Sequence, residues 1–320
     1  MIANHARLLF DPGNEALRFL PEGPYPCGPD RFSWVAIQHG PDANSGSLNI
    51  YDLRSQKNTS YLFPGRPGFA FVTDRGNFVV GCERGVGIYS PRDAVWKPFI
   101  QGIDARVTGT IVNDGITWNG NLIFGTKDLE FKTKKAGLYF WRRSDRRLFQ
   151  LRSDQICSNG KCVVPVDEHR ILLYDIDSPT RQVVKYTIDL LSGTSDEPRV
   201  VIDLRTEAGV PDGMTMTPDG RSAIISLYQP EPAPQGRTIQ VSFETGEVEK
   251  VWTVDASPQV TCPQWVSYNG NAALVMTTAV ENMPSSRRAE SPNAGSIFMC
   301  ETEIPWEEST FGRMTPVFLE

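Results

Sequence analysis

The chain has 320 residues, of which 40% are hydrophobic and 22% are charged, and its formal net charge is −6 at pH 7. This acidic balance argues against a nucleic-acid partner, which usually requires a basic face. No segment approaches the roughly 18–20 consecutive apolar residues of a membrane-spanning helix, and residues 1–7 lack the apolar core of a secretory signal. We therefore expect a cytoplasmic protein that binds neither nucleic acid nor a membrane.

Short hydrophobic runs, many rich in β-branched and aromatic residues, follow one another along the chain, and helical periodicity is nearly absent. Turn residues interrupt the runs about every 8–12 positions, which is typical of all-β proteins. Clear examples are residues 32–37, 77–82, 171–174, 222–227 and 272–277. We expect these runs to be β-strands.

The runs recur as a repeat: an entry segment, a turn, a second hydrophobic strand, and a third strand that ends in another turn. Copies begin about every 45–53 residues, the period of a four-stranded propeller blade. The six copies start near Glu22, Gly68, Asn113, Asn159, Asp212 and Cys262. They predict one all-β domain over residues 1–320, a six-bladed β-propeller. Part of residues 6–19 should pair with the last blade and close the ring, which removes an exposed sheet edge.

Four of these repeats open on a polar residue that can bind a metal ion. In a propeller the first strand of each blade lines the central channel, so side chains at the same phase point to one axis. We expect four such side chains to meet at one mouth of the channel, namely Glu22, Asn113, Asn159 and Asp212. Two carboxylates and two amide oxygens suit Ca²⁺ or another hard divalent ion.

The chain contains its own control for this argument. Asp212 belongs to Pro-Asp-Gly, an ordinary turn sequence, and the same tripeptide recurs around Asp219. Phase separates the two copies, because Asp212 opens a repeat whereas Asp219 lies between two strand-like runs inside one. We therefore predict a site residue at Asp212 and a plain hairpin turn at Asp219.

Motifs spread nearly from end to end resemble one known family of six-bladed propellers. It includes gluconolactonase, regucalcin (senescence marker protein) and luciferin-regenerating enzyme. The matching segments are Glu22-Gly23-Pro24, Asn113-Asp114-Gly115, Phe124-Gly125-Thr126, Ser158-Asn159-Gly160, Asp177-Ser178-Pro179-Thr180-Arg181, Pro211-Asp212-Gly213 and Ala294-Gly295-Ser296-Ile297-Phe298. The resemblance implies that the metal ligands are Glu22, Asn159 and Asp212. It also implies that Asn113 contacts metal or substrate and that Glu130 binds substrate hydroxyl groups.

The chain departs from the family pattern at two positions that bear on the substrate. Members that act on sugar lactones often carry an arginine two residues before the asparagine of Asn-Asp-Gly, where this chain has Ile111. Because an isoleucine cannot donate a hydrogen bond, Ile111 weighs against a gluconate-like substrate and favours a less hydroxylated or differently shaped lactone. Lys127 stands where methionine is common. Lys127 and Asp128 either supply polar contacts to the substrate or are exposed loop residues.

The sequence favours a hydrolase that opens a small lactone. A metal at this site can polarise the carbonyl as a Lewis acid, and Asp212 is the candidate catalytic base. Ca²⁺ comes first for an all-oxygen site, with Mg²⁺, Mn²⁺, Zn²⁺ or Fe²⁺ behind; with Zn²⁺ or Fe²⁺ a metal-bound hydroxide could attack directly. The alternatives are a calcium-binding propeller without lactonase activity and a metal-dependent phosphotriesterase or esterase.

A nucleophilic triad is a weaker hypothesis. The three histidines are scattered, and the Gly-x-Ser-x-Gly elbow of α/β-hydrolases is absent from the sequence. Only His39, before a polar insertion, could reach a pocket edge. The basic residues after Glu130, which are Lys132, Lys134 and Lys135, form either a solvated loop or a means of attracting an anionic substrate. The six cysteines lack metal-site spacing, and we expect buried free thiols.

Overall fold

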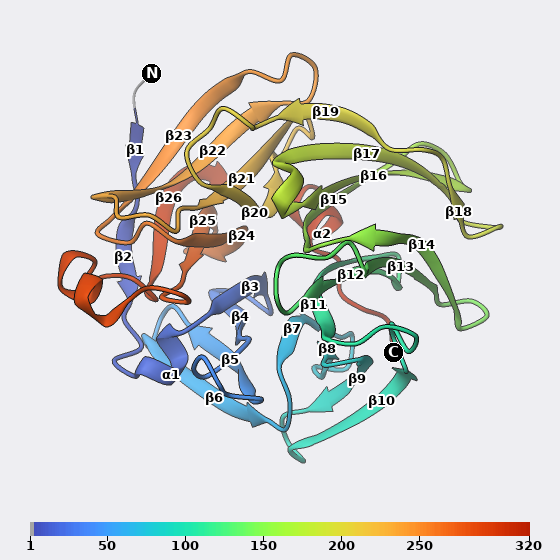
Figure 1. Ribbon diagram of the computed structural model, residues 1–320, viewed down its shortest axis with the longest axis horizontal. Helices are drawn as coiled ribbons and strands as arrows, with labels where there is room; N and C mark the ends of the chain where they lie inside the picture. The colour runs from blue at the N-terminus through green and yellow to red at the C-terminus, as the bar shows by residue number, and fades with distance from the viewer. Residues whose placement is uncertain (1–2) are drawn as a thin grey trace.

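The computed structural model describes residues 3–320, and it contains six sheets arranged around one axis as a β-propeller (Figure 1). The fold class that the repeat predicts is therefore confirmed. Three blades have four strands contributed by consecutive segments. Blade 1 contains β3 (Pro21–Pro26), β4 (Arg31–Ala36), β5 (Gly46–Asp52) and β6 (Lys57–Phe63). Blade 2 contains β7 (Pro67–Val72), β8 (Phe78–Cys82), β9 (Gly85–Ser90) and β10 (Val95–Gln101). Blade 3 contains β11 (Thr110–Trp118), β12 (Asn121–Asp128), β13 (Ala136–Arg142) and β14 (Arg147–Gln155).

The other three blades are more elaborate. Blade 4 contains β15 (Ser158–Pro165), β16 (Arg170–Asp177), β17 (Gln182–Asp189), β18 (Thr194–Ser195) and β19 (Arg199–Asp203). Blade 5 contains β20 (Val210–Met216), β21 (Ser222–Tyr228), β22 (Gln235–Ser242), β23 (Val248–Asp255) and β1 (Ala3–His5). Blade 6 contains β24 (Val260–Tyr268), β25 (Asn271–Thr278), β26 (Ile297–Pro305) and β2 (Arg7–Phe10). The helical segments are short: α1 (Glu15–Arg18), η1 (Ser178–Thr180), η2 (Ser285–Glu290) and α2 (Phe311–Met314).

The N-terminal segment closes the ring, as the sequence predicts. Strand β2 pairs antiparallel with β26 and forms the outer edge of blade 6. Strand β1 then pairs parallel with β23 and adds a fifth strand to blade 5, which the sequence analysis did not foresee. The same short segment therefore covers the outer edges of two neighbouring blades, and both edges lose unpaired backbone groups.

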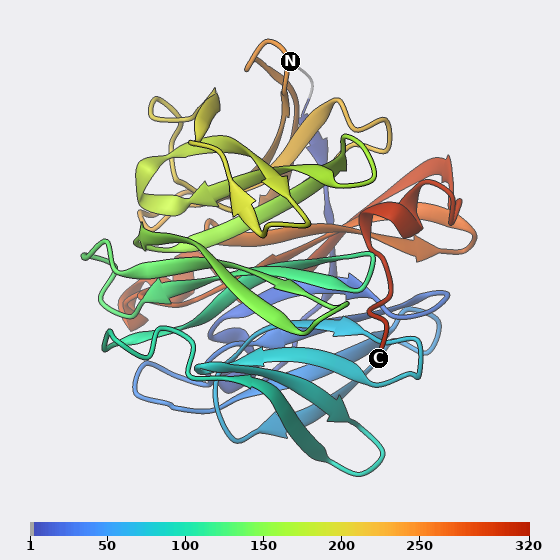
Figure 2. The same cartoon turned by 90° about the vertical axis from the view of Figure 1, so that its right-hand side faces the viewer.

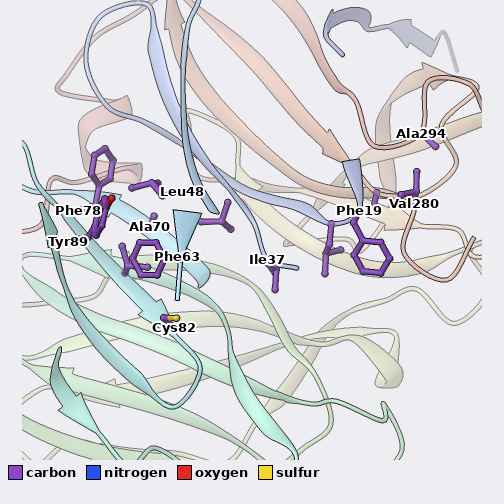
Figure 3. Close-up of a cluster of buried hydrophobic side chains, with 14 residues drawn as sticks. Phe19, Ile37, Leu48, Phe63, Ala70, Phe78, Cys82, Tyr89, Val280 and Ala294 are labelled. Carbon is purple, nitrogen blue, oxygen red and sulfur yellow. The ribbon is translucent and has the colours of Figure 1, made fainter. Parts of the chain in front are cut away.

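The hydrophobic core lies between neighbouring blades. One buried cluster joins Leu48 and Phe63 of blade 1 to Ala70 and Phe78 of blade 2 (Figure 3). Burying a side chain of the size of leucine or phenylalanine contributes about 1.5–3 kcal/mol. Because each sheet packs on the next through such a cluster, the blades hold their inner strands at fixed positions around the channel.

Every innermost strand contains a register shift near its start, at the same phase in all six blades. A bulge of this kind adds a residue to one strand and redirects its side chains. The shifts fall between Glu22 and Tyr25, Pro67 and Phe69, Val112 and Gly115, Asn159 and Lys161, Pro211 and Met214, and Val260 and Pro263. The repeat starts inferred from the sequence thus coincide with the bulges of the six inner strands.

Glycines beside these bulges let neighbouring inner strands approach closely. A Cβ atom on Gly160 would lie 2.5 Å from Cβ of Met214 and 2.8 Å from the carbonyl oxygen of Asp212. A Cβ atom on Gly213 would lie 2.7 Å from Cα of Cys262. No side chain fits at these points, so the glycines determine how tightly blades 4, 5 and 6 meet at the axis.

The C-terminal segment runs along one face of the disc (Figure 2). After blade 6, α2 places Met314 at the wall of the channel cavity. The Tyr25 hydroxyl donates to the carbonyl oxygen of Pro316 at 2.8 Å, and Phe318 N–H donates to the Val72 carbonyl at 2.9 Å. The segment therefore ties blades 1 and 2 to blade 6. Across residues 3–320, none of the helices has the length and hydrophobicity to cross a bilayer.

Candidate metal centre in the central channel

Four of the predicted site residues lie on four different inner strands, each at the bulge near the start of its strand. Glu22 lies in β3, Asn113 in β11, Asn159 in β15 and Asp212 in β20, and these strands surround the axis (Figure 1). The two asparagines are buried, and the two carboxylates are half-buried. Residues nearly two hundred positions apart in sequence are therefore brought into one cluster by closure of the ring.

Glu22 carries a carboxylate in an environment that disfavours its charge. Burial raises the pKa of Glu22 well above its ordinary value, and repulsion from Asp212 and Asp114 raises it further. The N–H of Gly23 donates to Glu22 Oε2 at 2.9 Å and, with the charge of Lys127, opposes the rise in this pKa. Glu22 and Asp212 are thus close enough to repel each other across the channel.

Asp212 shows the same behaviour. Burial raises its pKa well above the ordinary value, the ammonium of Lys127 opposes that rise, and the charges of Asp114 and Glu281 add to it. Within the described residues, neither Asp212 nor Glu22 has a basic group within 4.0 Å. Two half-buried carboxylates without a close counter-ion are costly, and a bound cation would relieve that cost.

The two asparagines are joined by a hydrogen bond. Nδ2 of Asn113 donates to Oδ1 of Asn159 at 2.7 Å and to the carbonyl oxygen of Ser158 at 3.0 Å. Nδ2 of Asn159 donates to the Ser178 hydroxyl at 2.8 Å and lies 3.4 Å from Sγ of Cys157. Because both amide NH₂ groups donate to protein acceptors, the two rotamers are fixed, and Oδ1 of Asn159 already accepts a hydrogen bond from Asn113.

This donor set fits a hard divalent cation. Glu22 and Asp212 supply negative charge, and Asn159 and Asn113 supply neutral amide oxygens, which are the ligand types that Ca²⁺ and Mg²⁺ prefer. No cluster of three or more Asp, Glu, His or Cys that could hold a metal occurs in the part of the chain that the structure describes. A metal bound here would therefore take two carboxylates and would complete its coordination with amide oxygens and water.

Ile111 and Lys127 face each other across β11 and β12. The Ile111 side chain is buried, and Lys127 is only 8% exposed. The backbone of Lys127 also forms an isolated bridge with Cys157, two residues before Asn159. Lys127 therefore lies at the junction of blades 3 and 4 beside the cluster, and not in a solvated loop.

Glu130 alone among the seven predicted site residues lies at the surface. Its carboxylate is exposed, and Oε2 is 4.0 Å from Nζ of Lys132. The loop is held by the buried carboxylate of Asp128, which accepts from the N–H groups of Glu130 and Thr133 at 3.2 and 2.8 Å and pairs with Nζ of Lys135 at 2.9 Å. Although burial opposes it, these donors hold the pKa of Asp128 well below its ordinary range.

Comparison with known proteins places the chain in a family. Residues 20–280 match the family model described as the SMP-30/gluconolactonase/LRE-like region. The chain belongs to this family. Over 281 residues, 85% of this chain and 87% of the relative, it is 28% identical to a Bacillus subtilis protein named as a candidate sugar lactone lactonase, YvrE. Regucalcin of Danio rerio is 22% identical over 80% of this chain and 87% of its own length.

Solved structures of family members share the fold of this SMP-30/gluconolactonase/LRE-like propeller. A calcium-binding protein, regucalcin, from Agrobacterium tumefaciens superposes with a TM-score of 0.79 at 19% identity and covers 99% of both chains. A luciferin-regenerating enzyme superposes with a TM-score of 0.72 at 21% identity over 88% of this chain and 90% of that one. At these identities the superpositions show the fold alone.

Sequence reasoning missed two carboxylates near the candidate site. Asp114 follows Asn113 at the bulge of β11 and lines a narrow channel cavity of about 40 Å³. Glu281 follows β25, and its backbone carbonyl accepts from the Tyr228 hydroxyl at 2.7 Å. Their charges act on Asp212. The adjacency of Asp114 to Asn113 was a usable signal, whereas nothing in the sequence marks Glu281.

A buried ion pair beneath the asparagines was also missed. Nζ of Lys161 lies 3.1 Å from Oδ1 of Asp175, and both side chains are fully buried. The same ammonium donates to the carbonyl oxygen of Asn159 at 2.7 Å and to the Ser158 hydroxyl at 3.0 Å. The pair therefore fixes the backbone that presents Asn159 to the channel.

The histidines lie outside this cluster. His5 bonds Thr253 and the exposed carboxylate of Asp255, and the ring of His39 lies 3.0 Å from the Ser47 hydroxyl. His169 is exposed in the turn before β16. Their positions give no support to a nucleophilic triad. All six cysteines are free, and four of them are buried as expected, whereas Cys27 and Cys300 are only partly buried.

Proposed function

We propose that this protein is a metal-dependent lactonase that hydrolyses the ester bond of a small lactone at the channel axis. The convergence of Glu22 and Asp212, two half-buried carboxylates without a close counter-ion, carries this proposal. The name of the Bacillus subtilis relative, which denotes a sugar lactone lactonase, supports the same class of reaction.

The metal would be held by Glu22, Asn159 and Asp212, with Asn113 as a further ligand or as a contact to the substrate. When bound, it would supply a Lewis acid that polarises the lactone carbonyl. Because the ligands are all oxygen atoms, Ca²⁺ is the first choice, ahead of Mg²⁺, Mn²⁺, Zn²⁺ and Fe²⁺.

Asp212 is the residue that we assign as general base. It takes a proton from the attacking water as the new carbon–oxygen bond forms, and the ring carbon–oxygen bond then breaks. The proton passes to the departing alkoxide, so the product is a hydroxy acid. Burial raises the pKa of Asp212 well above its ordinary value, which makes the carboxylate a stronger base. General-base action of this kind is worth about 10²–10⁴ in rate.

The residues beside the ligands indicate which lactones fit. Ile111 is apolar and buried, so it offers no donor to a sugar hydroxyl. Glu130 is exposed in the loop after β12 and is the remaining candidate for a hydroxyl contact. We therefore propose a lactone with few hydroxyl groups as the preferred substrate, with Asn113 and Lys127 as its polar contacts.

A calcium-binding role without catalysis is the second candidate. The regucalcin of Agrobacterium tumefaciens is described as a calcium-binding protein, and its fold matches this chain over 99% of both. In this protein the fixed rotamers of Asn113 and Asn159 suit a tightly held ion. Such a protein would bind Ca²⁺ and leave lactones intact.

One assay separates the two roles. Metal-free protein, prepared with EDTA, is mixed with a panel of γ- and δ-lactones, and acid release is followed with a pH indicator before and after Ca²⁺, Mn²⁺ or Zn²⁺ is restored. The proposal predicts hydrolysis that EDTA abolishes and a divalent metal restores. Metal binding without turnover of any lactone would establish the second role instead.

A further inference from the structure

Lys127 is the one cation whose charge acts on both Glu22 and Asp212 among the residues that the structure describes. It is also the strongest charge acting on Cys157, which flanks Asn159. These effects agree with the strand register, which places Lys127 opposite Ile111 and in a bridge with Cys157. The register and the bridge place the backbone of buried Lys127 next to the strands that carry Asn113 and Asn159, and the charge effects agree with that position.

The bonding of Lys127 differs from that of buried Lys161 and half-buried Lys135. Lys161 has a carboxylate oxygen of Asp175 at 3.1 Å, and Lys135 has one of Asp128 at 2.9 Å. Within residues 3–320, Lys127 has no carboxylate within 4.0 Å, although it is only 8% exposed. Lysine is rarely this buried unless it is paired. Its charge is therefore balanced at longer range, by the carboxylates of the channel.

We infer that Lys127 is the resident counter-cation of Glu22 and Asp212, so that a divalent metal binds there against its positive charge. This inference rests on the metal site of the proposed function and adds a role for a residue of this chain. Without metal, Lys127 partly neutralises the two carboxylates and keeps the site formed. With metal, it repels the ion and makes it exchangeable.

The inference is tested by whether one substitution strengthens or weakens metal binding. Replacing Lys127 with methionine removes the charge and keeps an unbranched side chain of similar length. If Lys127 acts by charge, Lys127→Met binds metal more tightly, by about tenfold or more, because a like charge in a site of low effective dielectric is removed. If Lys127 only supports the packing of the site, the same substitution weakens metal binding.

The measurement is isothermal titration calorimetry of the metal-free full chain with Ca²⁺, Mn²⁺ and Zn²⁺ in turn. Lys134→Met is the matched control, because Lys134 is exposed in the nearby loop and its loss changes the net charge equally. We expect the dissociation constant of Lys134→Met to stay within twofold of the original protein. Thermal melting of each variant shows that it is folded.

Each result decides the matter. Tighter binding by Lys127→Met alone supports the inference. Equal or weaker binding by Lys127→Met overturns it, and metal-dependent lactone hydrolysis in the original protein would then leave the proposed function standing. No binding of any of the three metals by the original protein or by either variant would overturn the inference and the proposed function together.

Discussion

Blade 5 contains the tripeptide Pro-Asp-Gly twice, and the two copies have opposite properties. Asp212, at the start of β20, is half-buried without a close cation, and burial raises its pKa well above the ordinary value. Asp219, in the turn between β20 and β21, is exposed. It accepts from the Thr217 hydroxyl at 2.6 Å and from Arg221 N–H at 3.1 Å, and these bonds lower its pKa.

The difference comes from what surrounds each copy and not from the tripeptide. Asp219 is satisfied within its own turn by residues two positions away, so its role is local. Asp212 sits at a bulge where the neighbouring blades approach closely, and its partners come from β3, β11 and β12. Position within the repeat therefore distinguishes the two residues. Asp212 lies at the bulge of an inner strand beside the channel, whereas Asp219 lies in a turn between two strands.

The largest effect should come from removing the charge at Asp212. Asp212→Asn keeps the shape of the side chain and removes both the base and a negative metal ligand, so we expect lactone hydrolysis to fall by about 10²–10⁴. Asp219→Asn should retain activity within twofold. The measurement is kcat/KM for the best lactone of the panel at saturating metal. Equal losses in the two variants would contradict the distinction between the copies.

The glycines that follow the two aspartates give the next comparison. Gly213→Ala places a Cβ atom 2.7 Å from Cα of Cys262, so blades 5 and 6 must separate. We expect a loss of about 1–3 kcal/mol in the free energy of unfolding and at least tenfold in activity. Gly220→Ala meets only Met216 Sδ, at 4.0 Å, but strains a residue with φ of +71°.

Gly220→Ala should therefore lose about 1–2 kcal/mol of stability and keep its activity. Urea unfolding and the lactone assay on both variants check these values. A fully active Gly213→Ala protein would show that close approach of the blades is not needed to form the site.

The two aspartates should also change stability with pH in opposite directions. Asp212 has a raised pKa in the folded protein, so its contribution to folding is fully present below the unfolded value of about 3.9 and is lost as pH rises through the raised value. In EDTA, Asp212→Asn should therefore melt at a higher temperature than the original protein at pH 8, and this advantage should disappear near pH 4.

Asp219 has a lowered pKa, and its smaller contribution is present above about pH 3.9 and lost as pH falls through the folded value. Asp219→Asn should melt slightly below the original protein at pH 8, with the gap closing in acid. Thermal melts from pH 3 to pH 8 test both variants. Parallel curves for the two substitutions would refute the burial of a charged Asp212.

Much of the fold can be predicted from the sequence, because the pattern of hydrophobic strands and turns repeats along the chain. The six repeat starts predict the six inner strands, and each predicted start lies at or beside a bulge. Residues at the same position in the sequence repeat therefore lie at the same position along their inner strands. Ring closure by β2 follows from the need to cover a sheet edge. The parallel pairing of β1 could not be predicted, because it depends on a neighbouring blade rather than on a local pattern.

The candidate site could be predicted only where its residues share the repeat phase. The structure brings together Glu22, Asn113, Asn159 and Asp212, whose roles as ligands stay a prediction. The buried pair of Lys161 and Asp175 gives no sequence signal, because burial of a charge depends on which strands cover it. Glu130 was assigned through resemblance alone, and the structure places it at the surface.

The central claim is that ring closure assembles one cation site from residues of separate blades. Crystals soaked in Mn²⁺ and measured near the manganese absorption edge would locate bound metal directly by its anomalous scattering. We predict one strong peak in contact with carboxylate oxygens of Glu22 and Asp212 and the amide oxygen of Asn159. A peak held only by other residues, or none at millimolar Mn²⁺, would contradict the account.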